Sequence, residues 1–176
     1  MPRDERAKVV PSVLLGVVIM AGAVARVESQ AQPRRPASTV QQLMQAILFP
    51  NANVIFAAQG DDPASLPRDA KPSASTNPLT GLYGGWQAVE NSSLALLESA
   101  DLMDVRGRAC ANGVLVPVDE SQWKTAVEAM REAALATAAA ARARSQEQII
   151  EATGQLAESC SGCHRIYRRA QKHCSR

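Results

Sequence analysis

Apolar residues recur along most of the chain at intervals of three and four positions, the spacing that places them on one face of an α-helix. Four stretches show this pattern: 38–59, 86–104, 119–144 and 145–167. The last has the longest uninterrupted seam, which runs through Ile149, Thr153, Leu156, Cys160, Cys163 and Tyr167. Beside it we expect a second buried row, formed by Ile150, Ala157 and His164. No stretch alternates apolar and polar residues with a period of two, so the pattern predicts an all-α fold without a sheet.

Local signals mark where the first helix begins and where it is interrupted. Residues 38–42, Ser-Thr-Val-Gln-Gln, carry a capping-box pattern, in which hydroxyl and glutamine side chains satisfy the first free amides. Pro50 has no amide hydrogen and clashes with the preceding turn, so it should end or kink the helix near Phe49. Because the apolar face resumes after the proline, we expect one kinked helix that reaches about Gln59.

The boundary between the third and fourth helices is marked by a cap alone. No Gly or Pro lies between Arg144 and Gln148, and propensity would join the two helices into a rod of roughly 50 residues, far above the usual length. Ser145, followed three positions later by Gln148, forms an N-cap pair, so we place the boundary there. By the same reasoning, Asp119 and Gln122 predict the start of the third helix.

Two longer connections separate the predicted helices. Residues 60–85 are rich in Gly, Pro, Asp, Ser, Thr and Asn, and their prolines exclude any long helix or strand. Residues 104–118 form the second connection and contain two glycines and a proline. Four helices joined in this way are most simply arranged as an antiparallel four-helix bundle. We place this domain at residues 38–176.

The start of the chain has the pattern of a secretory signal peptide. A net basic segment, residues 3–8, is followed by an apolar run over 9–25, and small-x-Ala patterns end at Ala25 and Ala31. We therefore expect residues 1–31 to be a signal peptide that is cleaved near one of these alanines, with the remainder exported. The alternative is an uncleaved membrane anchor, for which the run is short. No second stretch is apolar enough to span a bilayer, so we expect no membrane span after removal of the signal.

Composition and charge exclude some partners. The net charge of +2 argues against a nucleic-acid surface. Aromatic residues make up only 3% of the chain, so its small side chains supply little volume for a core, and a bulky apolar cofactor would supply the missing volume. The last turns are locally basic through Arg165, Arg168, Arg169, Lys172 and Arg176. This cluster is either a solvated helix end or a docking patch for an acidic redox partner.

The candidate chemistry lies in the segment Cys160-Ser161-Gly162-Cys163-His164, which is the Cys-x-x-Cys-His attachment signature of c-type haem. Two thiols add to the two vinyl groups of one porphyrin, and the histidine must reach the iron from the same side. On a helix, residues i, i+3 and i+4 share a face, so these three side chains converge on one patch. The motif therefore predicts a haem protein.

The place of the motif in the chain narrows the family. Residues 160–168 resemble the Cys-x-x-Cys-His-x-x-Tyr-Arg ending of the class II cytochromes c, which are the cytochromes c′ and their low-spin relatives. In the mitochondrial-type cytochromes c the motif stands near the start of the chain, whereas here it closes a chain of four helices. The resemblance covers residues 38–172, with the two long connections as variable parts.

This resemblance implies one covalent haem c near the C-terminal helix, and a role for each residue of the ending. Cys160 and Cys163 would be the thioether attachment points, and His164 would be the proximal iron ligand. Tyr167 would pack against the haem, and Arg168 would lie near it and face a propionate.

In the class II cytochromes c the first helix covers the other face of the iron. An apolar residue there leaves the iron five-coordinate and able to bind NO or CO, whereas a methionine closes the sixth position and favours electron transfer. Met44 is our candidate for this distal iron ligand, with Leu43, Ile47 and Leu48 as neighbours. The family commonly has an arginine one turn before the distal residue, and here Val40 holds that place.

The functional expectation is therefore a periplasmic electron carrier that exchanges single electrons with redox partner proteins. The alternative is a five-coordinate protein that binds NO or CO, for gas binding or detoxification. We do not expect a substrate-converting enzyme, because no further acid–base or nucleophile constellation occurs in the sequence. The resemblance also implies a homodimer, formed through the first two helices.

Three alternative hypotheses do not involve haem. Cys160, Cys163, His173 and Cys174 could hold a structural zinc ion, with His164 to spare. A thiol oxidoreductase would place its Cys-x-x-Cys at the start of a helix after a strand, and no strand is predicted here. The last alternative is a structural helical bundle with an accidental motif.

Two cysteines lie outside the haem motif, namely Cys110 and Cys174. In an oxidising compartment they could form a disulfide that ties the second connection to the tail. The sequence leaves this pairing open, because no distance constrains it.

Overall fold

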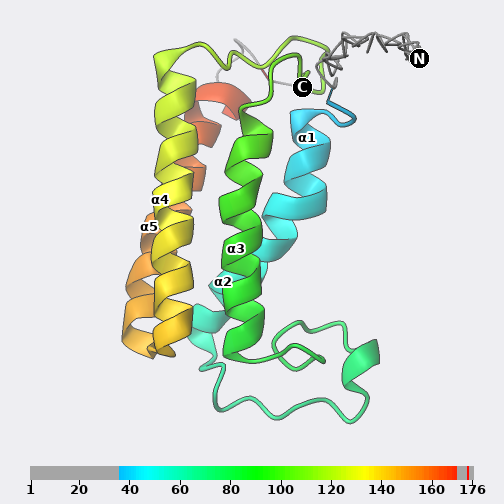
Figure 1. The fold of residues 1–176 in the computed structure, drawn as a ribbon, viewed down its shortest axis with the longest axis vertical. Coiled ribbons are helices and arrows are strands. Elements are labelled where there is room, and N and C mark those ends of the chain that lie inside the picture. Colours follow the sequence, from blue (N-terminus) through cyan, green and yellow to red (C-terminus); the bar gives the residue numbers. More distant parts are fainter. Residues whose placement is uncertain (1–35, 170–173, 175–176) are drawn as a thin grey trace, which may run out of the picture. The chain divides into compact units, whose positions relative to one another are not determined.

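The computed structural model describes residues 36–169 and Cys174 (Figure 1). The predicted signal peptide, its cleavage sites and most of the segment that leads to the first helix lie outside the described residues. The same is true of Lys172, His173 and Arg176. Among the described residues no helix has both the length and the apolarity that are needed to cross a bilayer.

Four runs of helix build the fold, as the sequence predicted. They comprise α1 (Val40–Leu43), the π-helical η1 (Met44–Leu48), α2 (Phe49–Gly60), α3 (Trp86–Met103), α4 (Ser121–Ala143), α5 (Gln146–His164) and the π-helical η3 (Arg165–Arg169). A 3-10 turn, η2 (Pro72–Ala74), lies in the long connection before α3. Successive runs are antiparallel (Figure 1): α3 packs against α4, α4 against α5, and α2 against both α3 and α5, which closes a four-helix bundle. Within 36–169 the only strand pairing is an isolated bridge between Ala109 and Leu115.

Side-chain caps begin two of these helices as predicted. Thr39 accepts a hydrogen bond from the Gln42 amide while the Gln42 side chain accepts one from the Thr39 amide, which completes a capping box. Ser145 accepts a hydrogen bond from the Gln148 amide and begins α5. Just before it, Arg144 takes a left-handed backbone conformation, with φ of 51°, and ends α4. The predicted boundary between the third and fourth helices is confirmed.

Asp119 does not cap α4, contrary to the sequence prediction. The N-cap residue is Glu120, and its side chain makes no capping hydrogen bond. The Asp119 carboxylate instead pairs with the Arg106 guanidinium, which holds the pKa of Asp119 below its ordinary value. Arg106 lies 13 positions earlier in the chain, so a local pattern could not show this competing partner.

The first helical run passes through Pro50 because the helix widens into a π turn. Pro50 has no amide hydrogen to donate, and η1 ends two positions before it. Here the Phe49 amide donates to the Met44 carbonyl, and Asn51 Nδ2 donates to the Ile47 carbonyl at 2.8 Å. The interruption predicted near Phe49 therefore takes the form of a π turn, a feature that is frequent at functional sites.

The buried face of α5 follows the predicted seam but is narrower than expected. Ile149 and Leu156 are completely buried, and Tyr167 lies in the core. Ile150 and Ala157 are exposed, and Ile150 keeps 45% of its surface in solvent. At 3.6 residues per turn they lie about 100° and 80° from Ile149 around the helix axis. The neighbouring helices do not cover this side of α5, so the predicted second row is wrong for these two residues.

Residue size along α4 decides where the bundle is open. Its second half buries small residues, namely Ala133, Ala134, Thr137, Ala138, Ala140 and Ala141. Small side chains let neighbouring helices lie close together. Its first half buries Trp123, Val127 and Met130. The helices are therefore closely packed near the α4–α5 turn. At the opposite end of the bundle, the larger side chains of α4 keep the helices further apart.

Candidate haem site

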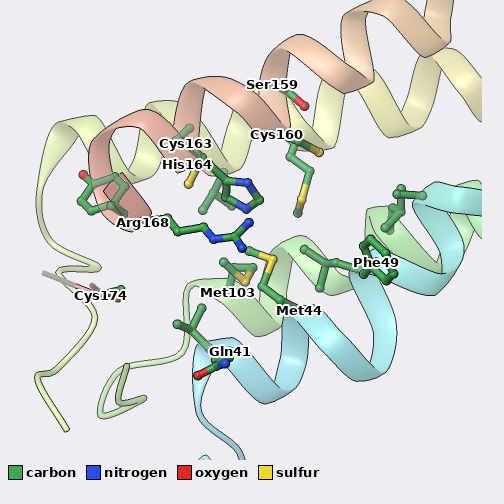
Figure 2. Close-up of a pocket in the computed structure, with 18 of the residues that line it drawn as sticks. Gln41, Met44, Phe49, Met103, Ser159, Cys160, Cys163, His164, Arg168 and Cys174 are labelled. Atoms are coloured by element: carbon green, nitrogen blue, oxygen red, sulfur yellow. The ribbon is translucent and has the colours of Figure 1, made fainter. Parts of the chain in front are cut away.

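A cavity of about 750 Å³ lies between the first helical run and the end of α5 (Figure 2). η1 and α2 form one wall, α5 and η3 form the facing wall, and α3 and α4 contribute the base. Its larger apolar lining residues include Leu48, Phe56, Leu96, Val127, Met130 and Leu156. The volume is in the range of small-molecule and cofactor sites, roughly 300–1,000 Å³.

The structure brings the Cys-x-x-Cys-His residues together on this cavity, as helical spacing predicted. Cys160, Cys163 and His164 occupy the last turns of α5, all three are half-buried, and all three line the cavity. Cys160 and Cys163 are free thiols and do not form a disulfide with each other. The helix continues from His164 directly into η3, so the backbone that carries the motif is continuous.

Burial keeps both thiols protonated at neutral pH. It raises the pKa of the Cys160 thiol, and it raises the pKa of the Cys163 thiol to about 11, with electrostatic interaction with the neighbouring Cys160 as a second cause. Catalytic and redox-active cysteines instead lie in environments that lower the thiol pKa. The surroundings of this pair are therefore those of neutral thiols and do not favour a thiol oxidoreductase.

Tyr167 and Trp123 form an aromatic pair at the edge of the cavity. Their ring centroids are 5.0 Å apart with the planes at 74°, an edge-to-face contact. Both side chains line the cavity and are almost fully buried. Burial raises the pKa of Tyr167, with smaller contributions from Glu120 and Cys163. Trp123 Nε1 has no hydrogen-bond acceptor among the described residues, and buried indole N–H groups ordinarily have one.

Arg168 also lines the cavity, although its side chain is exposed. Figure 2 shows the Arg168 guanidinium directed inward, toward the space between His164 and Met44. A guanidinium carries five N–H donors in a planar fork that matches a carboxylate. Its place is consistent with the predicted contact to a propionate.

Met44 lies on the wall that faces His164. It is the first residue of the π turn η1, it is half-buried, and its thioether points into the cavity (Figure 2). Val40, one turn earlier, also lines the cavity. Its apolar side chain cannot bind a carboxylate, so a propionate needs its partner elsewhere, and Trp123 and Arg168 are available.

Sequence patterns did not mark two of the lining residues as part of a site. Trp123 on α4 and Met103 on α3 occupy ordinary core positions of their helices, and nothing in their local sequence distinguishes them from packing residues. Only the packing of α3 and α4 around the cavity shows where their polar or sulfur atoms lie.

The residues of the cavity fit a haem. Its lining is largely apolar, imidazole and thioether sulfur face each other across it, and two thiols stand at one wall. The unsatisfied N–H of buried Trp123 and the guanidinium of Arg168 supply donors for carboxylates. His164, Cys160 and Cys163 would hold the group.

The zinc alternative loses one of its ligands. Cys174 is bonded to Cys110, with their Cα atoms 4.9 Å apart, so it offers no thiolate. The disulfide that the sequence left open is therefore present. His173 lies outside the described residues, and within the described part of the chain no three His, Cys, Asp or Glu residues cluster as metal ligands would.

Comparison with known proteins agrees with this geometry. The family model described as Cytochrome C' matches residues 118–168, which span α4, α5 and η3 as far as Arg168. No curated protein and no solved structure matches the chain. The matched residues include both thiols and the histidine that face the cavity, and the match confirms that this chain resembles the class II c-type cytochromes.

Proposed function

We propose that this protein is a periplasmic electron carrier that holds one covalent haem c in the cavity and uses Met44 as the distal iron ligand. The observation that carries the proposal is the placement of Met44 and His164 on facing walls of one apolar cavity, both directed inward. When bound, the haem supplies an iron centre that accepts and releases one electron.

Different residues of the chain would hold different parts of this group. Cys160 and Cys163 would fix it to α5 through thioethers, while His164 would hold the iron from the same helix. Trp123 and Arg168 would donate hydrogen bonds to its carboxylates. Met44 as a further iron ligand would raise the reduction potential of the group.

The apolar surroundings of the cavity also support a role in electron transfer. The large apolar residues along its base exclude water, and a low dielectric around an iron centre is one of the means by which a protein sets its potential. Arg168 lines the cavity and is exposed, and the exposed Arg165 lies three positions earlier on the same helical run. They support docking of an acidic redox partner, since charge complementarity accelerates encounter. Export to the periplasm is supported by the signal-peptide pattern of residues 1–31.

The distal ligand is tested with carbon monoxide and a pair of methionine variants. Met44→Leu and Met103→Leu both remove a sulfur from the cavity lining while conserving volume. The spectrum of the reduced wild-type protein is expected to stay unchanged under carbon monoxide, because the sixth position is closed. Met44→Leu should bind carbon monoxide with a large spectral shift, and Met103→Leu should behave as the wild type.

A wild-type protein that already shows the large shift would contradict Met44 ligation. The open iron would then make NO or CO binding the function of the site, and electron transfer through a methionine-closed centre would be abandoned.

The proximal ligand is tested by replacing each of the two histidines of the chain. His164→Ala is expected to abolish the low-spin absorption spectrum of the haem while the thioether bonds remain, because one axial ligand is lost. His173→Ala removes the other histidine and should leave the spectrum as in the wild type. An unaltered spectrum in His164→Ala would exclude this residue as the iron ligand.

A further inference from the structure

The connection between α3 and α4 links two parts of the chain that lie on facing walls of the cavity. On one side, the Val40 amide donates to the Ala109 carbonyl at 2.9 Å, which attaches the first residue of α1 to this connection. On the other side, the next residue, Cys110, is bonded to Cys174. The Cys174 amide in turn donates to the Tyr167 carbonyl of η3 at 3.2 Å. A continuous series of links therefore joins the start of α1 to the end of the haem-binding helix.

Arg108 adds a second attachment to the start of the first helix. Its Nη1 donates to the Ser38 carbonyl at 2.7 Å and to Ser38 Oγ at 2.9 Å, and its Nε donates to the Leu102 carbonyl at 3.0 Å. The residue is 5% exposed, and burial lowers the pKa of the guanidinium. A buried cation is costly unless its hydrogen bonds are made, so the position of Ser38 and the burial of Arg108 depend on each other.

These links form one edge of the cavity. Val40, Ala111 and Cys174 all line it. Met44 follows Val40 by one helical turn, and the π turn that begins at Met44 departs from regular α-helical hydrogen bonding. The direction of the Met44 thioether therefore depends on where the first turn of the helix is held.

We propose that Arg108 and the Cys110–Cys174 disulfide are positioning residues for the distal ligand. They hold residues 38–44 against the α3–α4 connection, so that Met44 remains directed at the iron and the sixth position remains closed. This inference rests on the proposed function, in which Met44 is that ligand.

The test compares variants of the links with a matched variant in the same connection. Arg108→Met removes the hydrogen bonds to Ser38 while conserving most of the side chain, and Arg108→Lys keeps the positive charge and a single donor nitrogen. Cys110→Ser/Cys174→Ser removes the disulfide without leaving an unpaired thiol. The control is Arg106→Met, which removes an exposed ion pair with Asp119. All are prepared with haem bound.

Two readouts are measured on each variant. The first is hydrogen exchange of the amides at 40–44, which should be about tenfold faster in Arg108→Met and in the double serine variant, the factor that corresponds to loss of a hydrogen bond. The second is carbon monoxide binding by the reduced protein, which should strengthen by a similar factor. Arg108→Lys should restore part of both effects, and Arg106→Met should match the wild type.

The exchange readout does not depend on the identity of the distal ligand. If the wild type bound carbon monoxide freely, the proposed function would fail while the exchange measurement still tested the attachment. Unaltered exchange at 40–44 in both link variants would overturn the inference. So would faster exchange at 40–44 with unaltered carbon monoxide binding, or an equal acceleration throughout α4, which would show a general loss of stability.

Discussion

Replacing both Cys160 and Cys163 with alanine is expected to abolish covalent haem attachment completely. These are the two free thiols on the cavity, and no other cysteine of the chain is available, because Cys110 and Cys174 are bonded to each other. The measurement is haem staining of the protein after denaturing electrophoresis, together with extraction into acidified organic solvent. The wild type should keep its stain, and the variant should release any haem that it has bound.

The matched control removes the other two cysteines of the chain. Cys110→Ala/Cys174→Ala should stain as strongly as the wild type after denaturation, because those residues do not attach the haem. Covalent staining of the Cys160→Ala/Cys163→Ala protein would refute the assignment of the thioether sites. In the absence of haem the cavity of about 750 Å³ has no apolar group to fill it, so the variant should also bind a hydrophobic dye such as ANS more strongly than the wild type.

Replacing Leu156 with alanine is expected to lower the free energy of unfolding by about 2–5 kcal/mol. Leu156 is completely buried on the α5 seam and also lines the cavity. Its loss removes apolar contacts on both sides and leaves a void that the rigid bundle fills only in part. The measurement is urea unfolding of the haem-loaded protein, followed by far-ultraviolet circular dichroism.

Leu135→Ala provides the comparison, because it makes the same chemical change on α4 at a side chain that is 50% exposed. We expect its free energy of unfolding to stay within about 0.5 kcal/mol of the wild-type value. Equal losses for the two variants would contradict the burial pattern of α5 and, with it, the orientation of this helix in the bundle.

The helices and most of their ends could be predicted from sequence because local interactions set them. The capping box at Thr39 and the cap at Ser145 involve residues three positions apart, so the pattern contains both partners. The failed cap at Asp119 shows the limit of this reasoning. Its carboxylate pairs with Arg106 in the preceding connection instead of capping the helix. A rule that considers only residues three or four positions away does not include this partner.

The π turn at Met44 illustrates a partial success. The sequence marked the position, since Pro50 must disturb the helix, but it predicted an end or a kink and not a widened turn. The Asn51 side chain satisfies the Ile47 carbonyl, and packing of the run on α3 and α5 keeps the backbone helical on both sides.

Sequence patterns were enough to predict the four helices, the place of the haem motif on the last of them and the convergence of Cys160, Cys163 and His164. All of these follow from spacing within a single helix. Which other residues complete the site depends on how the helices pack together. This packing leaves Ile150 exposed, and it brings Trp123 and Met103 to the cavity. The physical reason is that helical periodicity defines the faces of each helix, whereas the neighbouring helices decide which face is covered and which side chains meet.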